Sequence, residues 1–514
     1  MAGGPGARTA TDWAAYNAAR YPARPALENA DTGEGWTWRQ VDDRVGRLAG
    51  VLAERLGVGR GDRLAVLAHN HPRQLELQLA CWRLGAVFVP LNWRLSPAEL
   101  EHCLRDAEPV VLAHDAACAE LATGTAAAAG LEALASWGRV DSGLDLDTEA
   151  ERAAYRPPSG ESSLDDPAQL LYTSGTTGRP KGAICTLATI IWHSVNMAEP
   201  AAVSGPGDRH LASLPLFHAG GLNGVTNPVL LRGGCVRVTP RFDPAQSLAL
   251  LGDPANGVTH FSGPPFAYLT MAGLPDFDRA DFTAMRYGQL GGGYLEAELA
   301  GEYARRGVTL LSTYGATEMG PSVTSMTPHF AASKVGSCGF PLQHLQIRLV
   351  DESGADVDPG AIGELWVRGP AITPGYWRHD PASCFEPGGW FRSGDAMRVD
   401  EDGFYFMTGR FKDMYKSGGE NVFAAEVEDV LVGHPDVAEI GVIGVPDPKW
   451  GELGRAVVVP RPGARVTVED LAAFAGDRLA RYKLPRSVVL ADELPRNGAG
   501  KVVKARLKEL HGGA

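Results

Sequence analysis

Residues 172–182 read Tyr172-Thr-Ser-Gly-Thr-Thr-Gly-Arg-Pro-Lys-Gly182 and directly follow the apolar run Gln169-Leu-Leu171. The stretch combines three glycines and four Ser or Thr hydroxyls with two cations. A strand that runs into such a loop brings backbone N–H groups and hydroxyls close to phosphate oxygens. A Walker loop places Ser or Thr directly after its Gly-Lys pair, whereas here Pro180 precedes Lys181 and a glycine follows it. The sequence therefore predicts a phosphate-binding loop of another type, and a surface turn is the alternative.

Length and composition favour a globular enzyme built from several compact units. A chain of 514 residues exceeds one hydrophobic core. The net charge of −13 argues against a nucleic-acid partner, because phosphate backbones bind net positive faces. The seven cysteines are scattered without metal-ligand spacing, which predicts reduced thiols, no zinc site and a cytoplasmic protein. No apolar signal region or run of about eighteen apolar residues is present, so we expect no transmembrane segment.

The first part of the chain alternates between helical and strand periodicity. The pattern predicts a helix over 37–56, a strand over 63–68, a helix over 75–84 and a strand over 86–90. This rhythm favours parallel sheets covered by helices. The alanine-rich residues 113–136 predict a loosely specified helical excursion, and residues 141–167 a polar connector.

After Gly409 the pattern changes to that of a small α+β domain. Short strands are predicted over 440–445 and 455–460. Thr467 with Asp470 resembles a capping box that opens a helix to about Tyr482. Residues 495–501 are rich in turn signals.

Four further strings allow the loop to be compared with known sequences. They are Ser312-Thr-Tyr-Gly-Ala-Thr-Glu318, Trp390-Phe-Arg-Ser-Gly-Asp395, Gly409-Arg410 and Pro495-Arg-Asn-Gly-Ala-Gly-Lys501. Together with residues 172–182, in this order and spacing, they resemble the adenylate-forming superfamily. That superfamily includes acyl-CoA synthetases, peptide-synthetase adenylation domains and luciferases. The resemblance extends from about residue 35 to Lys501.

The resemblance implies an α/β fold with a large N-terminal domain and a small mobile α+β C-terminal domain. The large domain is expected to hold mostly parallel sheets flanked by helices, plus a small β-barrel-like subdomain. It is expected to span residues 1–409, with a hinge at 410–412 and the small domain at 413–514.

The same resemblance implies roles for individual residues in joining a carboxylate to ATP. Tyr314 stacks on adenine, Thr317 bonds the α-phosphate and Glu318 holds Mg²⁺ through oxygen. Asp395 and Arg410 bind the ribose, and Lys501 is a mobile cation aimed at the bond that forms. The remaining residues expected at the nucleotide are Thr173, Ser174, Gly175, Thr176, Thr177, Lys181, Gly292, Gly293, Gly315 and Ala316.

A second half-reaction, with CoA, is implied by the segment Tyr415-Lys-Ser-Gly-Gly-Glu-Asn421. It resembles the lining of the pantetheine tunnel of CoA ligases, with Lys416, Gly418 and Gly419 as its contacts. The family moves its small domain between the two steps about the position of Lys412.

The acid substrate is predicted less closely. By resemblance, residues 217–224, 261–265 and 291–294 line the acyl pocket with Ala316, and His218 stands at the aromatic gate between acid and thiol. A core histidine is the alternative for His218. No acidic side chain occurs over 217–224, so a substrate ammonium would lack a partner and amino acids are disfavoured. The abundant glycines favour a bulky apolar or aromatic acid. Three departures from the family pattern together indicate an atypical one: Gly293-Tyr294 in place of Ala-Pro, Leu187 in place of a histidine and Ala424 in place of a proline.

The sequence thus predicts an AMP-forming acid–thiol ligase that uses ATP, Mg²⁺ and CoA. One alternative is an adenylating enzyme that hands a secondary-metabolite acid to an acyl carrier protein or partner ligase. A catalytically silent nucleotide-binding protein and a luciferase-like oxygenase are the others.

Overall fold

The structure is a computed structural model that describes residues 12–138, 140, 142–158, 163–174, 179–200, 202–417, 420–496 and 502–513. Residues 1–346 and 368–389 pack as one compact unit, and residues 347–367 and 390–514 pack as another. The expected hinge at 410–412 lies inside the second unit. The domain boundaries and the mobility of the small domain stay predictions.

A parallel sheet forms the first half of the first unit. Within the described residues the strand order is β7-β6-β5-β3-β4-β8-β9, and all pairings are parallel except that of β8 with β9. The strands are β3 (Arg63–Leu67), β4 (Val87–Leu91), β5 (Val111–His114), β6 (Leu134–Ser136), β7 (Leu144–Asp145), β8 (Pro167–Ser174) and β9 (Pro180–Thr186). The helices are α1 (Trp13–Arg20), α2 (Trp38–Glu54), α3 (Pro72–Leu84), α4 (Pro97–Ala107), α5 (Ala119–Ala129), α6 (Leu146–Arg152) and α7 (Leu187–Asn196). The predicted parallel sheet with covering helices is confirmed.

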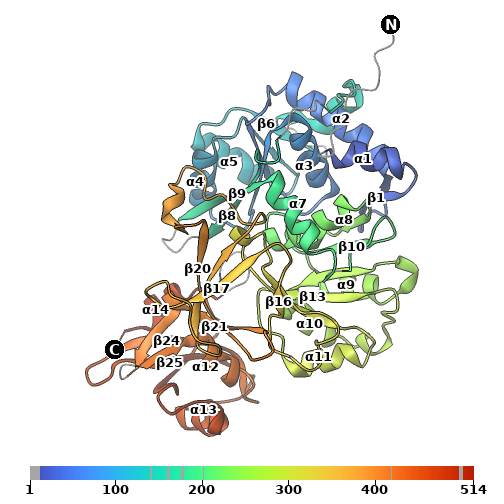
Figure 1. The fold of residues 1–514 in the computed structure, drawn as a ribbon. Coiled ribbons are helices and arrows are strands. Elements are labelled where there is room, and N and C mark those ends of the chain that lie inside the picture. The colour runs from blue at the N-terminus through green and yellow to red at the C-terminus, as the bar shows by residue number, and fades with distance from the viewer. Residues whose placement is uncertain are drawn as a thin grey trace. The chain divides into compact units, whose positions relative to one another are not determined.

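A second sheet completes the first unit, with the order β16-β15-β14-β13-β12-β10-β11-β1-β2 among the described strands. Its strands are β1 (Pro25–Asn29), β2 (Gly35–Thr37), β10 (Arg209–Ala212), β11 (Cys235–Val238), β12 (His260–Gly263), β13 (Tyr287–Gly291), β14 (Leu310–Tyr314), β15 (Thr324–Ser325) and β16 (Phe340–Pro341). Helical segments are η1 (Gly220–Thr226), a π-helix, with α8 (Asn227–Leu231), α9 (Pro244–Leu251), η2 (Pro254–Asn256), α10 (Pro265–Ala272), η3 (Phe277–Arg279), α11 (Ala297–Ala304) and η4 (Thr317–Met319). Helices α9, α10 and α11 lie together beside β13 (Figure 1).

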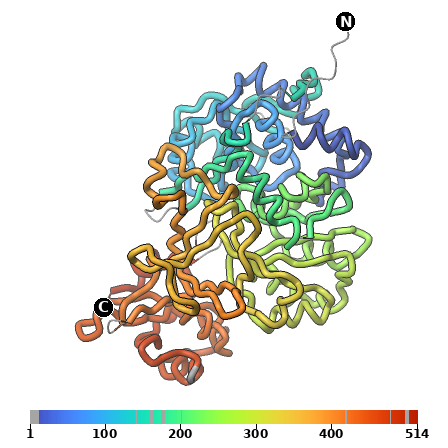
Figure 2. Tube along the Cα trace, in the orientation of Figure 1, coloured from blue at the N-terminus to red at the C-terminus, as the bar shows by residue number. Residues whose placement is uncertain are grey.

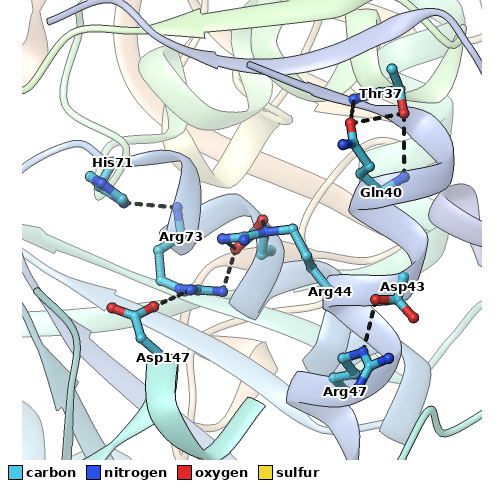
Figure 3. Close-up of polar contacts among 9 residues, drawn as sticks. Thr37, Gln40, Asp43, Arg44, Arg47, His71, Arg73 and Asp147 are labelled. Atoms are coloured by element: carbon cyan, nitrogen blue, oxygen red, sulfur yellow. Dashed lines mark hydrogen bonds and ion pairs between the residues drawn. The ribbon is translucent and has the colours of Figure 1, made fainter. Parts of the chain in front are cut away.

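Helix α2 shows how local sequence fixes the elements of this unit. Thr37 caps it with Gln40 in a reciprocal capping box, and its apolar stripe is buried. On its polar side Arg44 pairs with Glu76 of α3, which also accepts a 2.6 Å bond from Arg73. Arg73 in turn pairs with Asp147 of α6 (Figure 3). These ion pairs join three helices that are far apart in the sequence.

Residues 368–389 return from the second unit to pack on the first (Figure 2). The indole N–H of Trp377 donates to the backbone oxygen of Asp106 at 3.2 Å, and Tyr376 forms a backbone bridge with Ala183 of β9. This segment contains η5 (Pro381–Ser383) and β19 (Phe385–Glu386). The return places Tyr376 beside the strand that follows the predicted phosphate loop.

The second unit contains two groups of strands. The first group is β17 (Gln346–Val350), β18 (Gly363–Arg368), β20 (Trp390–Val399) and β21 (Tyr405–Arg410), side by side in that order. The second, with its helices, is η6 (Phe411–Asp413), β22 (Met414–Ser417), β23 (Glu420–Phe423), α12 (Ala424–Leu431), β24 (Val437–Asp447), β25 (Gly451–Pro460), α13 (Val468–Ala475), η7 (Gly476–Arg478), β26 (Ser487–Leu490) and α14 (Lys504–His511). The predicted strands over 440–445 and 455–460 are confirmed within β24 and β25.

Two local predictions differ from the structure. The capping box of Thr467 and Asp470 is present, but helix α13 ends at Ala475 rather than near Tyr482. Gly476 stops it by adopting a φ of +51°. The polar connector over 141–167 contains helix α6. This helix is rich in charged residues, so its sequence resembles that of a polar connector. Among the described residues, every helix is too short or too polar to cross a lipid bilayer.

Candidate active site

Four neighbouring strands end at the same edge of the second sheet. Strands β10, β12, β13 and β14 pair in parallel, so their carboxyl ends point the same way. The segments that follow them are 213–218, which leads into the predicted 217–224, and 264–265, 292–294 and 315–318, which lie within the predicted 261–265, 291–294 and 312–318. Ligands in open α/β sheets bind outside such carboxyl ends. The fold therefore brings the predicted acyl and adenine segments together at one edge.

The predicted phosphate loop closes an antiparallel hairpin. Thr173 pairs with Lys181, and Ser174 pairs with Pro180, across β8 and β9. Gly175, Thr176, Thr177 and Gly178 lie outside the described residues. The hairpin sets the hydroxyl-bearing Thr173 and the cation Lys181 opposite each other beside its loop.

The carboxylate of Glu318 lies where three segments of the first unit meet. Its Oε1 accepts a hydrogen bond from the hydroxyl of Tyr376 at 2.7 Å and one from the Thr173 hydroxyl at 3.3 Å. Its backbone oxygen accepts from the N–H of Thr373 at 2.9 Å. The ammonium of Lys181 lies 5.6 Å from the centre of the Tyr376 ring. The structure thus joins the phosphate hairpin to the segment that carries Thr317 and Glu318.

Tyr376 is the residue of this cluster that sequence reasoning missed. It follows Pro374 and Gly375 in a loop, and aromatic residues beside such turns are a weak signal for a binding site. Nothing in the neighbouring sequence indicates that residues 368–389 pack back on the first unit. Only the three-dimensional contact with Glu318 places it in this cluster.

The oxygen groups of this cluster fit Mg²⁺. Glu318 offers a partly buried carboxylate, and the Thr173 hydroxyl adds a neutral oxygen beside it. Mg²⁺ prefers one or two carboxylates with phosphate and water oxygens to complete its shell. The nearby Cys185 does not offer a soft thiolate ligand, because its side chain is buried and burial raises the pKa of its thiol to about 12. Mg²⁺ binding by Glu318 remains a proposal.

Local backbone geometry explains two glycines expected at the nucleotide, Gly315 and Gly292. A Cβ at Gly315 would lie 2.0 Å from the backbone oxygen of Pro321. Gly292 adopts a φ of +79°, which side chains rarely tolerate. Tyr314 ends β14, and Ala316 and Thr317 follow at the start of η4. Close approach of the chain to itself therefore requires Gly315, whatever its distance from a nucleotide.

His218 is partly buried and lies just before the π-helix η1. Its backbone oxygen accepts from the N–H of Leu222 at 2.9 Å, so it stands at the entrance of the π-helix η1. Its ring centre lies 5.9 Å from that of Phe217. π-helical turns are frequent at functional sites, and this turn sets the direction of the predicted gate.

A closed ring of four buried amides fixes that turn. Gln169 of β8 donates to Gln78 at 2.8 Å, Gln78 to Asn227 at 2.8 Å, Asn227 to Asn223 at 2.6 Å and Asn223 back to Gln169 at 2.9 Å. All four are at most 2% exposed. Each amide gives and receives one bond, so the set is satisfied within itself. Asn223, expected in the acyl pocket, thus uses its amide to tie η1 to the strand before the phosphate loop.

The second unit holds the predicted ribose pair. Asp395 is opposite Arg410 in the register of β20 and β21, and the guanidinium Nε of Arg410 lies 2.8 Å from Oδ1 of Asp395. Asp395 is buried, whereas nearly half of the Arg410 side chain is exposed. The pair therefore presents a held carboxylate and an accessible cation on neighbouring strands. Lys416 lies exposed on β22, where its backbone N–H donates to Glu452 at 3.0 Å.

Three predicted residues of the second unit, Gly418, Gly419 and Lys501, lie outside the described residues. Their roles stay predictions. Lys412, the expected pivot, lies in the short helix η6 directly after Arg410.

Comparison with known proteins agrees with this arrangement. The family model described as "AMP-binding enzyme" matches residues 14–377, and "AMP-binding enzyme C-terminal domain" matches residues 426–501. A feruloyl-CoA synthase of Amycolatopsis sp is 40% identical over 501 residues, which cover 97% of this chain and 98% of that protein. An indoleacetate–CoA ligase of Aromatoleum aromaticum is 36% identical over 503 residues, with 97% and 98% coverage.

A solved structure shows the same likeness in three dimensions. The o-succinylbenzoate coenzyme A synthetase of Bacillus subtilis, in complex with ATP and magnesium ion, has a TM-score of 0.85 and 29% identity. The superposition covers 97% of this chain and 99% of the Bacillus subtilis chain. The sequence strings, the fold and the family models agree, and the chain belongs to the AMP-binding enzyme family.

Proposed function

We propose that this enzyme activates a bulky apolar or aromatic carboxylic acid with ATP and transfers the acyl group to CoA. The products are acyl-CoA, AMP and pyrophosphate. The observation that carries the proposal is the meeting of Thr173, Glu318 and Tyr376 next to Lys181. A carboxylate, hydroxyls and a cation at the mouth of a Gly/Ser/Thr hairpin are what a nucleotide triphosphate with its metal requires.

In the first step a carboxylate oxygen of the acid attacks the α-phosphorus of ATP. The bond from this phosphorus to the bridging oxygen breaks, and pyrophosphate leaves. Thr173 and Lys181 hold the departing phosphates, and Thr317 bonds the α-phosphate. Mg²⁺, when bound, neutralises charge on the phosphate oxygens. Tyr376 keeps the Glu318 carboxylate in one orientation, so that little reorganisation is needed as charge develops.

The held pair of Asp395 and Arg410 is suited to the ribose. The two carboxylate oxygens of Asp395 can accept from both ribose hydroxyls, and Arg410 already restrains one of them. Lys501 adds a cation to the adenylation step only. Its place in a turn-rich segment favours a group that arrives and leaves with the small domain.

In the second step the thiol of CoA attacks the acyl carbonyl carbon of the mixed anhydride. AMP leaves, and the thiol proton passes to solvent. We assign Lys416, Gly418 and Gly419 to the path of the pantetheine arm, with the second domain turned about Lys412 after pyrophosphate has gone. A glycine at 419 leaves space that a side chain would fill.

Two observations support an apolar or aromatic acid, rather than an amino acid, as the substrate. No acidic side chain occurs over 217–224 to pair with a substrate ammonium. Both curated relatives reported above carry aromatic acids in their names, ferulate and indoleacetate. The same names favour CoA over a carrier protein as the acceptor.

The test is a panel of acids assayed for AMP and pyrophosphate with and without CoA. We expect ferulate and indoleacetate to give CoA-dependent AMP release, and decanoate and phenylalanine to give much less. AMP release that CoA leaves unchanged for every acid, with acyl-AMP accumulating, would favour transfer to a carrier protein. Absence of AMP with all acids would overturn the proposal.

A further inference from the structure

A second cluster of ligand-type side chains lies in the first unit, apart from the nucleotide residues in sequence and fold. His69 follows strand β3, and Asp115 and Cys118 follow strand β5. Strands β3 and β5 are parallel neighbours, so both loops lie at the same carboxyl edge of the sheet. One ligand atom from each residue lies within 4.8 Å of those of the other two.

All three ligand atoms converge on one point. Nδ1 of His69 is 3.3 Å from Oδ2 of Asp115 and 4.0 Å from Sγ of Cys118. A tetrahedral ion with bonds of about 2.0–2.3 Å to N, O and S separates its ligands by roughly 3.3–3.6 Å. The nitrogen–oxygen edge therefore already has the required length, and the nitrogen–sulfur edge exceeds it by only a few tenths of an ångström.

The arrangement differs from that of a nucleophilic triad. In such a triad the thiol and the carboxylate use different ring nitrogens, because the imidazole relays a proton between them. Here Sγ and Oδ2 both face Nδ1 of His69. One nitrogen cannot serve both partners as a relay, whereas a shared cation would satisfy all three groups at once.

The surroundings hold these groups in place. Asp115 accepts from the backbone N–H groups of His69 at 3.0 Å and Cys118 at 2.8 Å, which fixes both loops around its carboxylate. The ring of Trp93 lies against His69 with centres 4.3 Å apart. Cys118 is the N-cap of helix α5, which fixes its side chain at the start of that helix beside Asp115. The neighbouring His71 does not belong to this group of ligands. Its Nδ1 accepts from the N–H of Arg73 as the N-cap of α3 (Figure 3).

We propose that His69, Asp115 and Cys118 form a binding site for a borderline-soft divalent metal ion, with Zn²⁺ as its best occupant. Imidazole, thiolate and carboxylate together select Zn²⁺ over Mg²⁺. The ion displaces the thiol proton, which passes to solvent, and takes a water as its fourth ligand on the exposed side of His69. The ion would clamp the loop after β3 to the loop after β5.

The site has a structural consequence for its neighbour in the chain. Asn70 donates from its side chain to the backbone oxygen of Leu214 at 2.8 Å and accepts from the N–H of Leu216 at 2.9 Å. These residues lead into His218 and the π-helix. A metal at His69 therefore stabilises a loop on which the predicted acyl region rests, without touching the nucleotide residues.

Cobalt is the direct probe, because a cobalt–thiolate bond gives a charge-transfer band in the near ultraviolet. Chelator-treated full-length enzyme is titrated with Co²⁺ in excess Mg²⁺, which occupies hard oxygen sites. We expect one Co²⁺ per chain with this band, loss of the band on addition of Zn²⁺, and a higher Tm with Zn²⁺. His69→Gln, which retains a hydrogen-bonding side chain, and Cys118→Ser should each weaken binding by at least ~100-fold.

Two variants serve as matched controls. Cys384→Ser removes a partly exposed cysteine elsewhere in the same unit, and Glu318→Gln removes the proposed magnesium ligand; both should keep the band. If Cys118→Ser does not fold, the His69→Gln variant decides the question. A band that survives His69→Gln would show that cobalt binds a thiolate without His69, and cobalt bound without any thiolate band would show that Cys118 is not a ligand. Either result would overturn the proposal.

Discussion

The hydroxyl of Tyr376 donates a 2.7 Å hydrogen bond to the carboxylate of Glu318, although 58 residues separate the two in the chain. The bond aims a carboxylate that also accepts from Thr173 of the phosphate hairpin. It links the returning segment 368–389 to the two strings from which the sequence predicts nucleotide binding.

Replacing Tyr376 with phenylalanine should lower kcat/KM for ATP by about 10- to 100-fold. A hydrogen bond to a charged group is worth about 1.5–3 kcal/mol, and here its loss frees the Glu318 carboxylate to rotate. The KM for the acid should change much less. Steady-state kinetics with varied MgATP checks this result. Tyr303→Phe is the matched control, because its hydroxyl donates to the backbone oxygen of Tyr268 in a buried aromatic cluster; equal losses in both variants would assign Tyr376 to packing.

Substitutions in the ring of four amides should have non-additive effects on the free energy of unfolding. Gln169→Met leaves a donor on Asn223 and an acceptor on Gln78 buried without partners, which should cost about 1–3 kcal/mol for each group. The fourfold variant Gln78→Met, Gln169→Met, Asn223→Leu and Asn227→Leu removes every polar group together. It should therefore be more stable than the sum of the single variants implies.

Urea unfolding of the single and fourfold variants measures these differences. Kinetics then separates packing from positioning. If the ring positions η1, the fourfold variant should regain stability but keep a raised KM for the acid. A fourfold variant with normal kinetics would show that the ring contributes to folding alone.

A buried histidine predicts acid sensitivity. His210 on β10 is 2% exposed, and its Nδ1 donates to the backbone oxygen of His260 at 3.2 Å. Burial, with His260 nearby, lowers the pKa of His210 from 6.5 to about 3. Between these values the unfolded chain binds a proton that the native protein does not, so the free energy of unfolding decreases as the pH falls.

The variant His210→Asn keeps a donor near the position of Nδ1 but cannot be protonated. Between about pH 6 and pH 4 its unfolding free energy should vary less steeply with pH, by up to ~1.4 kcal/mol per pH unit. Chemical denaturation at several pH values checks this. The exposed His379→Asn should leave the slope unchanged; an unchanged slope in His210→Asn would mean that His210 is protonated in the native protein.

The two half-reactions should separate by mutation if the small domain alternates. Lys501→Ala should slow adenylation by roughly 10²–10³-fold, the effect of losing one preorganised donor. It should spare thioester formation from added acyl-adenylate. Gly419→Leu should show the reverse, because its side chain would fill the pantetheine path. Rapid-quench assays of each step are the measurement, and equal slowing of both steps by Lys501→Ala would refute alternation.

Local sequence predicted most elements that depend on local chemistry. The stripe over 37–56 became helix α2, and the capping box of Thr467 and Asp470 formed as expected. Strand β8 ends where the glycines of the phosphate loop begin. These features rest on periodicity and on hydrogen bonds between residues three apart, which one short window of sequence contains.

The features that sequence reasoning missed depend on distant contacts. Tyr376 contacts Glu318 only because residues 368–389 pack back on the first unit. The amide of Asn223 donates to Gln169, 54 residues away. His69 and Cys118 come from separate loops, so cysteine spacing could not show that their side chains lie together. Side-chain type alone does not reveal such partners.

Activation of the acid before CoA reacts can be followed in a single turnover with ferulate and ATP labelled at the α-phosphate. Enzyme in excess is first quenched without CoA and then after addition of CoA. We expect enzyme-bound feruloyl-AMP and one equivalent of pyrophosphate before CoA, followed by conversion of the label to AMP with formation of feruloyl-CoA. Label that remains in ATP without CoA, for ferulate and for every other acid that supports turnover, would show that no acyl-adenylate precedes the thioester.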